Sequence, residues 1–199
     1  PVTLTLSESW LKLTGQAQYG DDLAFSDMLC GKILRSPFPH ARIASIDVCE
    51  ALKVPGVAAV MTGKDTPGIT FPAQVDDMHP LAMEKVRYVG DAVAAVAAET
   101  EAAAREALEK IRVEYEQLPA LLDPAEALEE GAARIHGEKG NLVLPINRDF
   151  GDVDASFAAS DRVYEDEYET QAAAHCNMEP RCSVARMTSD GILEVWSGT

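Results

Sequence analysis

Basic residues are scarce in this sequence. Seventeen lysines and arginines stand against 33 aspartates and glutamates among 199 residues, which gives a formal net charge of −16. Long-range repulsion from so acidic a chain argues against nucleic acid or an anionic membrane as a partner. The acidic residues are spread mainly over residues 99–130 and 149–169. This spread favours a solvated acidic surface, with electrostatic docking of a partner as the alternative.

Cysteine is also scarce, and long apolar runs are missing. The four cysteines are Cys30, Cys49, Cys176 and Cys182. They form no CxxC pair and show no zinc-ligand spacing, and no fourth ligand lies near His175, Cys176 and Cys182. We therefore predict no metal site. No run of about 18 apolar residues could span a membrane, and we expect no signal peptide at the start. We expect a reducing, cytoplasmic setting.

Most catalytic motifs are absent from the sequence. It contains no GxGxxG, no P-loop, no GxSxG and no HExxH, which argues against the nucleotide-binding, hydrolase and zinc-protease classes that these motifs mark. Gly15 and Gly20 bracket a run better explained by a turn into Asp21-Asp22. The adjacent pairs Asp21-Asp22 and Asp76-Asp77 are poor acid–base partners, because neighbouring side chains on a strand point apart.

What the sequence does contain is a series of short strands separated by turn signals. We predict strands over residues 28–34, 42–48, 57–61, 92–98, 111–116, 163–170, 183–187 and 192–196. Residues 92–98 are almost all small and apolar, which is typical of a strand buried on both faces. Residues 62–80 form a loop longer than a plain connection needs, which suggests a functional or mobile loop. The Asp190-Gly191 step favours a hairpin turn between the last two strands.

One helix is clear from its periodicity. Its apolar stripe consists of Ala104, Ala107, Leu108 and Ile111, at the i, i+3, i+4, i+7 spacing of one helix face. Thr100 is placed to cap its N-terminus. The opposite face carries the i,i+4 ion pairs Glu101 with Arg105 and Glu106 with Lys110.

The proline-rich stretch after this region marks a domain boundary. We predict a first domain over residues 1–120, a linker with a short helix over 121–148, and the beginning of a second domain over 149–199. Within the linker, residues 125–130 form the short helix and 137–145 are extended. In the second domain, Asp152 is expected to cap a short helix with a small apolar face.

Two histidine-containing segments are candidates for function. His40, with Arg35 and Arg42 nearby, is either an anion contact or a histidine packed under a loop whose arginines pair with acidic neighbours; we favour the packed histidine. The segment HCNMEPR over residues 175–181 is the better candidate. It either locks a corner or places His175 and Glu179 close to a cofactor. In both cases we expect Glu179 to be buried and hydrogen-bonded to backbone N–H groups or to Arg181.

Several runs in order resemble one protein family. They are TGQAQYGDD at residues 14–22, RSPFPHARI at 35–43, PGVAAVMTG at 55–63, PLAMEKVRYVGDAVAAVAA at 80–98, IRVEYEQLP at 111–119, GDVDASF at 151–157, HxxMEP at 175–180 and VWSGT at 195–199. Together they resemble the start of the large, molybdenum-cofactor-carrying subunit of the xanthine dehydrogenase and aldehyde oxidase family. The first two runs look nearest to the 4-hydroxybenzoyl-CoA reductase type.

The resemblance implies an α+β fold, with an α/β hammerhead domain followed by the start of a molybdopterin-binding domain. It also implies an oxidoreductase that hydroxylates or reduces carbon centres at molybdenum. Its partners would be the remaining molybdopterin domains and subunits that carry [2Fe–2S] clusters and FAD. His175 and Glu179 become tentative cofactor-proximal residues.

The sequence departs from the family pattern in ways that limit what can be transferred. The glycine-rich GGGFG-type loop, the catalytic glutamate and the glutamine expected after residue 199 are absent, and residues 7–12 replace the usual basic approach to the first run. No catalytic residue is therefore assigned, and we expect no cofactor and no turnover in this chain alone. The alternative function is a free-standing hammerhead module that docks partners within an oxidoreductase complex.

Overall fold

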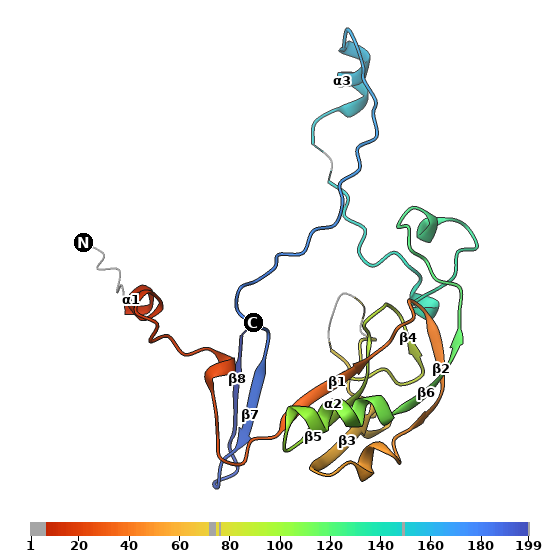
Figure 1. Cartoon of the computed structure of the whole chain (residues 1–199). Helices are drawn as coiled ribbons and strands as arrows, with labels where there is room; N and C mark the ends of the chain where they lie inside the picture. The colour runs from red at the N-terminus through yellow and green to blue at the C-terminus, as the bar shows by residue number, and fades with distance from the viewer. Residues whose placement is uncertain (1–6, 72–74, 76, 149, 199) are drawn as a thin grey trace. The chain divides into compact units, whose positions relative to one another are not determined.

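The computed structural model describes residues 7–71, 75, 77–148 and 150–198 (Figure 1), and its contacts divide the chain into two units. One unit is Leu29–Gly151, and the other combines Pro1–Met28 with Asp152–Thr199. Each unit mixes short helices with antiparallel strands. The α+β class expected from the sequence is confirmed.

The described residues of the unit Leu29–Gly151 form two three-stranded antiparallel sheets. In the first sheet, β5 (Ala92–Ala98) lies between β1 (Cys30–Arg35) and β3 (Val57–Thr62). In the second sheet, β2 (Ala41–Asp47) lies between β4 (Lys85–Val86) and β6 (Arg112–Gln117). Strands that are neighbours in a sheet are far apart in the sequence. The two sheets therefore join distant segments of the chain, and the loops between these segments differ greatly in length.

Strand β5 contributes to both hydrophobic cores of this unit. Val93 packs with Val86 in one core, whereas Ala94, Val96 and Ala98 belong to the other. All four β5 side chains are at most 1% exposed. Successive side chains of a strand point to opposite faces, so a strand covered on both sides can serve two cores. The predicted strand buried on both faces is confirmed at the predicted residues.

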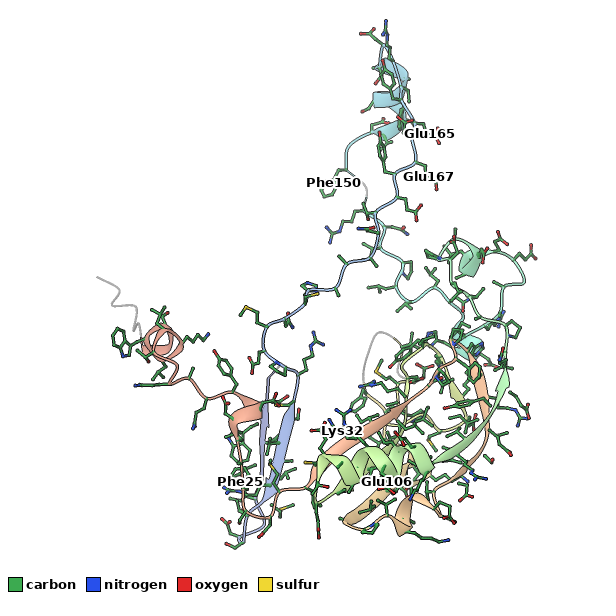
Figure 2. All side chains as sticks on the ribbon, in the orientation of Figure 1. Phe25, Lys32, Glu106, Phe150, Glu165 and Glu167 are labelled. Carbon is green, nitrogen blue, oxygen red and sulfur yellow. The ribbon has the colours of Figure 1, made fainter. Side chains whose placement is uncertain are left out.

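The helix α2 (Glu101–Lys110) packs on the first sheet with the predicted face. Thr100 Oγ1 accepts a hydrogen bond from the backbone N–H of Ala103 at 3.1 Å, which caps the helix as expected. Ala104 and Ala107 are fully buried, and Leu108 packs partly buried at the edge of the same core. Both predicted ion pairs form on the solvent side, where Figure 2 labels Glu106; such exposed pairs are worth only a few tenths of a kcal/mol.

Single turns of 3-10 helix shape the connections of this unit: Ala51–Lys53, Gly63–Asp65, Glu126–Leu128 and Gly137–Lys139. The helix predicted over 125–130 is thus only one tight turn, and the stretch 137–145, predicted to be extended, begins with another. Gly63 is required by a close approach, because a Cβ there would lie 2.6 Å from the carbonyl oxygen of Ala82.

The second unit holds α1 (Ser7–Leu13), a 3-10 turn at Gly20–Asp22, α3 (Val153–Ala159) and the hairpin of β7 (Ser183–Met187) and β8 (Leu193–Ser197). The hairpin and its turn match the prediction. Asp152 Oδ1 accepts from the backbone N–H of Ala155 at 2.9 Å, which confirms the cap of α3.

The strand predicted over residues 163–170 is wrong. Within the described part of the chain these residues belong to no strand, and all of them are exposed. Their β-branched and aromatic composition suits a strand, but a strand forms only where a neighbouring chain takes up its backbone N–H and C=O groups. The apolar face predicted on α3 is likewise uncovered, with Val153 51% and Phe157 58% exposed. Figure 2 shows Glu165 and Glu167 on the same uncovered stretch.

Among the helices described, none combines the length and the apolar character that crossing a lipid bilayer requires.

Candidate functional site

The segment expected either to lock a corner or to lie close to a cofactor surrounds an open hollow of about 400 Å³. A single continuous stretch lines it: Ala174, His175, Cys176, Asn177, Glu179, Pro180 and Arg181. The two candidate residues, His175 and Glu179, therefore do lie on one concave surface. Because one stretch makes the whole lining, the hollow is one wall of a site and is not enclosed by these residues.

A bend at Cys176 gives this segment its shape. Cys176 has a backbone φ of 48°, and among the described residues it is the only non-glycine with positive φ. The left-handed region is unfavourable for a residue with a Cβ, at a cost of order 1 kcal/mol. The bend lies within the stretch, so residues on both sides of it can line the same hollow. An unfavourable backbone conformation of this kind is common in ligand-binding segments.

Glu179 is exposed rather than buried, so our expectation for its environment is wrong in this chain. Its carboxylate lies against Gly198, since a Cβ on Gly198 would come within 2.8 Å of Glu179 Oε1. Burial of Glu179 requires a layer over residues 175–181, which the described residues of this chain do not form. Without that layer water solvates the carboxylate, and burial no longer forces it to find a protein partner.

Cys182 connects this segment to the N-terminal run 14–22. A Cβ on Gly20 would lie only 2.3 Å from Cys182 Sγ, so glycine is needed for the thiol to pack there. Burial, and next the hydrogen bond with the Asp21 carboxylate, raise the pKa of the Cys182 thiol above its ordinary value. The thiol therefore stays protonated at neutral pH and acts in packing rather than as a nucleophile.

The predicted turn at the end of run 14–22 is confirmed. Asp22 Oδ2 accepts from the backbone N–H of Tyr19 at 2.9 Å and closes the 3-10 turn Gly20–Asp22. The carboxylate of Asp22 thus holds a turn, and Asp21 faces Cys182. Of the second acidic pair, Asp76 lies outside the described residues.

Asp77 lies in a polar cluster of the unit Leu29–Gly151. Its Oδ2 is 3.2 Å from Arg87 Nη2 and 2.9 Å from His136 Nδ1. Lys85 Nζ donates to the carbonyl oxygen of Ile135 at 2.6 Å, and burial followed by the charge of Arg87 lowers the pKa of Lys85. Of these residues the sequence pointed only to Asp77, as half of an adjacent acidic pair. The cluster itself was not predicted, because its residues come from three separate segments and only the fold brings them together.

His40 is packed as a structural residue. It is 6% exposed, and its Nδ1 lies 2.7 Å from the carbonyl oxygen of Pro119. A carbonyl can only accept, so Nδ1 carries the hydrogen. Arg42 pairs with Glu116 on the adjacent strand, and Arg35 donates to the carbonyl oxygen of Gly90. His40 is thus packed as we favoured and Arg42 pairs with an acidic neighbour, whereas Arg35 contacts a backbone carbonyl rather than an acidic side chain.

The described residues form no cluster of three or more histidine, cysteine, aspartate or glutamate side chains that could hold a metal ion. What the segment 174–181 offers instead is a set of N–H donors and one carboxylate on an open surface. The imidazole of His175, the amide of Asn177 and the guanidinium of Arg181 all line the hollow. Such donors suit a ligand rich in carbonyl and phosphate oxygens.

Two family profiles match the chain in succession. Residues 14–119 match the aldehyde oxidase and xanthine dehydrogenase a/b hammerhead domain, and residues 135–199 match the molybdopterin cofactor-binding domain. A probable xanthine dehydrogenase subunit of Bacillus subtilis (strain 168) is 46% identical over 189 residues, which are 94% of this chain and 25% of that protein. The nicotinate dehydrogenase large molybdopterin subunit of Eubacterium barkeri is 39% identical, over 94% of this chain and 44% of that protein.

Solved structures agree with the profiles. The crystal structure of quinoline 2-oxidoreductase from Pseudomonas putida 86 matches with a TM-score of 0.85 and 38% identity, over 96% of this chain and 26% of that chain. The chain thus spans between a quarter and just under half of the length of these relatives. It belongs to the aldehyde oxidase and xanthine dehydrogenase family, as a hammerhead domain followed by the start of a molybdopterin-binding domain.

Proposed function

We propose that this chain is the N-terminal part of the large subunit of a molybdenum hydroxylase-type oxidoreductase. The observation that carries the proposal is the succession of the two profiles, hammerhead and then molybdopterin-binding, along one chain. We further propose the division expected from the sequence: the hammerhead domain over 1–120, a linker over 121–148 and the first molybdopterin domain from 149 onward. The chain alone is expected to bind no molybdenum and to turn over no substrate.

The residues of segment 174–181 fit one side of a molybdopterin site. His175, Asn177 and Arg181 supply N–H donors for the oxygens of a pterin and its phosphate, and the glycine at position 198 allows the Glu179 carboxylate to approach its backbone closely. When bound in the family's enzymes, the molybdenum cofactor supplies the centre that exchanges electrons with a substrate carbon. We propose that His175 and Glu179 lie next to this cofactor and orient it.

Electron transfer beyond the cofactor would use other subunits. Relatives carry names such as large molybdopterin subunit, molybdenum-binding subunit and large subunit, which describe members of multi-subunit complexes. We propose partner subunits that hold [2Fe–2S] clusters and FAD, to which the strongly acidic chain would dock through complementary basic surfaces. The four free cysteines are consistent with a reducing, cytoplasmic compartment.

We propose only the class of the substrate, which is a molecule with an aromatic or aldehyde carbon centre. The names of the relatives mention xanthine, nicotinate and quinoline, so the family as sampled acts on several ring systems. The similarity of runs 14–22 and 35–43 to the 4-hydroxybenzoyl-CoA reductase type stays a prediction.

A chimera tests the proposal. The chain would replace the matching quarter of the Bacillus subtilis relative, and molybdenum content and substrate-dependent dye reduction would be measured together with those of the isolated chain. We expect molybdenum and activity in the chimera and neither in the isolated chain. A folded chimera without molybdenum, or stoichiometric molybdenum in the isolated chain, would contradict the proposal.

The encoding gene gives a second test. A reading frame that continues past Thr199 into a glycine-rich loop would support the proposal, and a stop codon there would favour the free-standing docking module.

Point variants in the chimera test the two site residues. Glu179→Gln and His175→Gln should reduce turnover by at least tenfold at unchanged melting temperature if the side chains contact the cofactor. Glu165→Gln is the matched control, since Glu165 is also an exposed carboxylate of the same unit. A lower melting temperature with full turnover at permissive temperature would instead show that residues 175–181 only lock a corner.

A further inference from the structure

The unit Leu29–Gly151 exposes several large apolar side chains close to one another. We call Ile69, Phe71, Met78, Tyr88 and Val89 the apolar patch. Their exposed fractions run from 46% for Met78 to 64% for Val89. Single exposed apolar residues are ordinary on protein surfaces, but a contiguous group marks a contact surface. These five side chains form such a group only if their segments are held together.

Hydrogen bonds and a shared cavity join the patch. The backbone N–H of Phe71 donates to the carbonyl oxygen of Met78 at 2.8 Å in an antiparallel bridge, which sets the two side chains beside each other. His79 Nδ1 donates to the carbonyl oxygen of Ile69 at 2.9 Å. Met78 and Tyr88 line the same cavity, and Val89 follows Tyr88 in the chain. These contacts bring the described residues of the loop between β3 and β4 beside the turn before β5.

A cavity of about 180 Å³ opens at this patch. An apolar cavity of roughly 150 Å³ accepts a benzene ring, so this one has room for a single apolar side chain. At its wall, Arg87 Nε is buried and has no hydrogen-bond partner among the described residues. A buried donor without an acceptor costs about 1–3 kcal/mol, and such a group calls for an acceptor brought by another molecule or segment.

The charges around Arg87 indicate which kind of acceptor fits. The guanidinium is already paired with Asp77, and the carboxylate of Asp91 accepts from the backbone N–H of Arg87 at 3.1 Å. Because the Asp77 carboxylate already pairs with the guanidinium, Nε needs an acceptor and not a second negative charge. An uncharged oxygen such as a peptide carbonyl can accept from Nε. An apolar side chain together with a peptide carbonyl is what a polypeptide segment presents.

We propose that the apolar patch is the docking surface for the rest of the large-subunit polypeptide, a segment of which places an apolar side chain in the cavity and a backbone carbonyl against Arg87 Nε. The inference rests on the proposed function. The lengths of the relatives support the inference. This chain covers only 25% of the Bacillus subtilis relative and 26% of the quinoline 2-oxidoreductase chain. In both proteins about three quarters of the same polypeptide therefore lies beyond the matched region. A central apolar anchor in a pocket is the common form of such contacts.

Thiol labelling measures whether the patch becomes covered. Met78→Cys would be introduced into the 199-residue chain and into the chimera with the Bacillus subtilis relative, and both would be treated with a maleimide. Cys49, an exposed native thiol of the same unit, is the internal reference. We expect the introduced thiol to react at least tenfold more slowly in the chimera than in the isolated chain, relative to Cys49. Equal relative rates would overturn the proposal.

A second pair of variants tests the same surface without a new thiol. Phe71→Ser and Leu52→Ser remove side chains of the same unit that are 48% and 52% exposed. In the isolated chain both should change the melting temperature little. In the chimera, Phe71→Ser should lower the yield of assembled protein severalfold, and Leu52→Ser should not. Equal yields for the two variants would contradict the docking surface.

Failure of the docking proposal and failure of the proposed function look different in these experiments. If the chimera contains molybdenum and turns over substrate while the Met78→Cys thiol stays reactive, the proposed function stands and the docking surface is rejected. If the chimera protects this thiol but contains no molybdenum, the docking surface stands and the proposed function is rejected. Protection that appears only after an iron–sulfur subunit is added would assign the patch to that subunit and overturn the proposal.

Discussion

The guanidinium of Arg186 lies 4.6 Å from the centroid of the Phe25 ring, and the same group is 5.6 Å from the centroid of Trp196. The ring centroids of Phe25 and Trp196 are themselves 5.4 Å apart. Arg186 also pairs with Glu194 across the hairpin. The guanidinium and the two rings thus form one cluster, which attaches the N-terminal segment to the β7–β8 hairpin, two parts of one unit that the chain separates by about 160 residues.

The first prediction concerns this attachment. Arg186→Ala should destabilise the packing of Phe25 on the hairpin by about 0.5–1 kcal/mol, the usual worth of an exposed cation–π contact. Fluorescence of Trp196 in a Trp10→Phe background would report it, because Trp10 and Trp196 are the two tryptophans of the chain. Arg186→Lys is the matched control, which keeps the charge and loses the planar stacking. Unchanged emission in Arg186→Ala would show that the rings do not depend on the cation.

A second prediction tests the face of α2. Leu108→Ala should lower the free energy of unfolding by about 2 kcal/mol. This value is at the lower end of the range of about 2–5 kcal/mol seen for buried leucines, because Leu108 is only partly buried in its core. Glu109→Ala, on the exposed side of the same helix, should change it by less than about 0.5 kcal/mol. Urea titration of both variants gives the comparison. A change below about 0.5 kcal/mol for Leu108→Ala would mean that the face is assigned wrongly.

The close approach at Gly63 leads to a third prediction. Gly63→Ala places a Cβ 2.6 Å from the carbonyl oxygen of Ala82 and 2.9 Å from Met83 Cα, both backbone atoms that cannot move aside cheaply. We expect a loss of about 1–3 kcal/mol, as for other overpacked sites. Gly31→Ala is the control, since nothing lies within 4 Å of its Cβ position and its φ is ordinary. Equal melting temperatures for the two variants would refute the close approach.

The fourth prediction is a pH dependence. Asp65 Oδ2 accepts from the backbone N–H of Thr62 at 2.7 Å and from its hydroxyl at 3.0 Å, and these hydrogen bonds lower the pKa of Asp65 below its ordinary 3.8. Between that lowered value and 3.8 the unfolded chain binds more protons than the folded chain. Stability from this carboxylate is therefore present above the ordinary pKa and is lost as pH falls through the folded pKa.

Asp65→Asn removes this titration and should make the free energy of unfolding less steep with pH in the acid range. Urea titrations from about pH 5 to about pH 2.5 would show it. Lys64→Gln changes a neighbour in the same turn without removing a carboxylate, so its pH profile should keep the slope of the unmodified chain. Identical slopes for Asp65→Asn and the unmodified chain would show that this hydrogen bond does not link folding to protonation.

The sequence predicted best where one segment contains its own determinants. The periodicity of α2, the cap by Thr100 and the hairpin turn at Asp190-Gly191 all depend on residues within a few positions of one another, and each is confirmed. The buried strand β5 was also predicted from composition alone, since a run of small apolar residues has few alternatives in water. The family, too, could be recognised from short runs in order.

Predictions failed where the outcome depends on a neighbour that the local sequence does not specify. Residues 163–170 contain β-branched and aromatic residues but have no pairing strand in the described part of the chain, so they are exposed. Glu179 lies beside a rigid turn, but no described segment covers it, so it is exposed as well. The helix expected at 125–130 is a single tight turn, because a short segment gains too little from its own hydrogen bonds to outweigh tertiary context.

The amino-acid sequence by itself determined the α+β class, the family, and the helix and five of the six strands described in the unit Leu29–Gly151, because each follows from residue types at short spacing. It also singled out residues 175–181 as a candidate site, but it missed the two-residue strand β4. Only the tertiary structure decided which distant groups meet. It placed Cys182 against Gly20, Arg186 over the rings of Phe25 and Trp196, and Arg87 beside Asp77 at the apolar patch. These contacts join residues from 10 to about 160 positions apart, and their formation depends on packing across the whole unit rather than on local backbone preference.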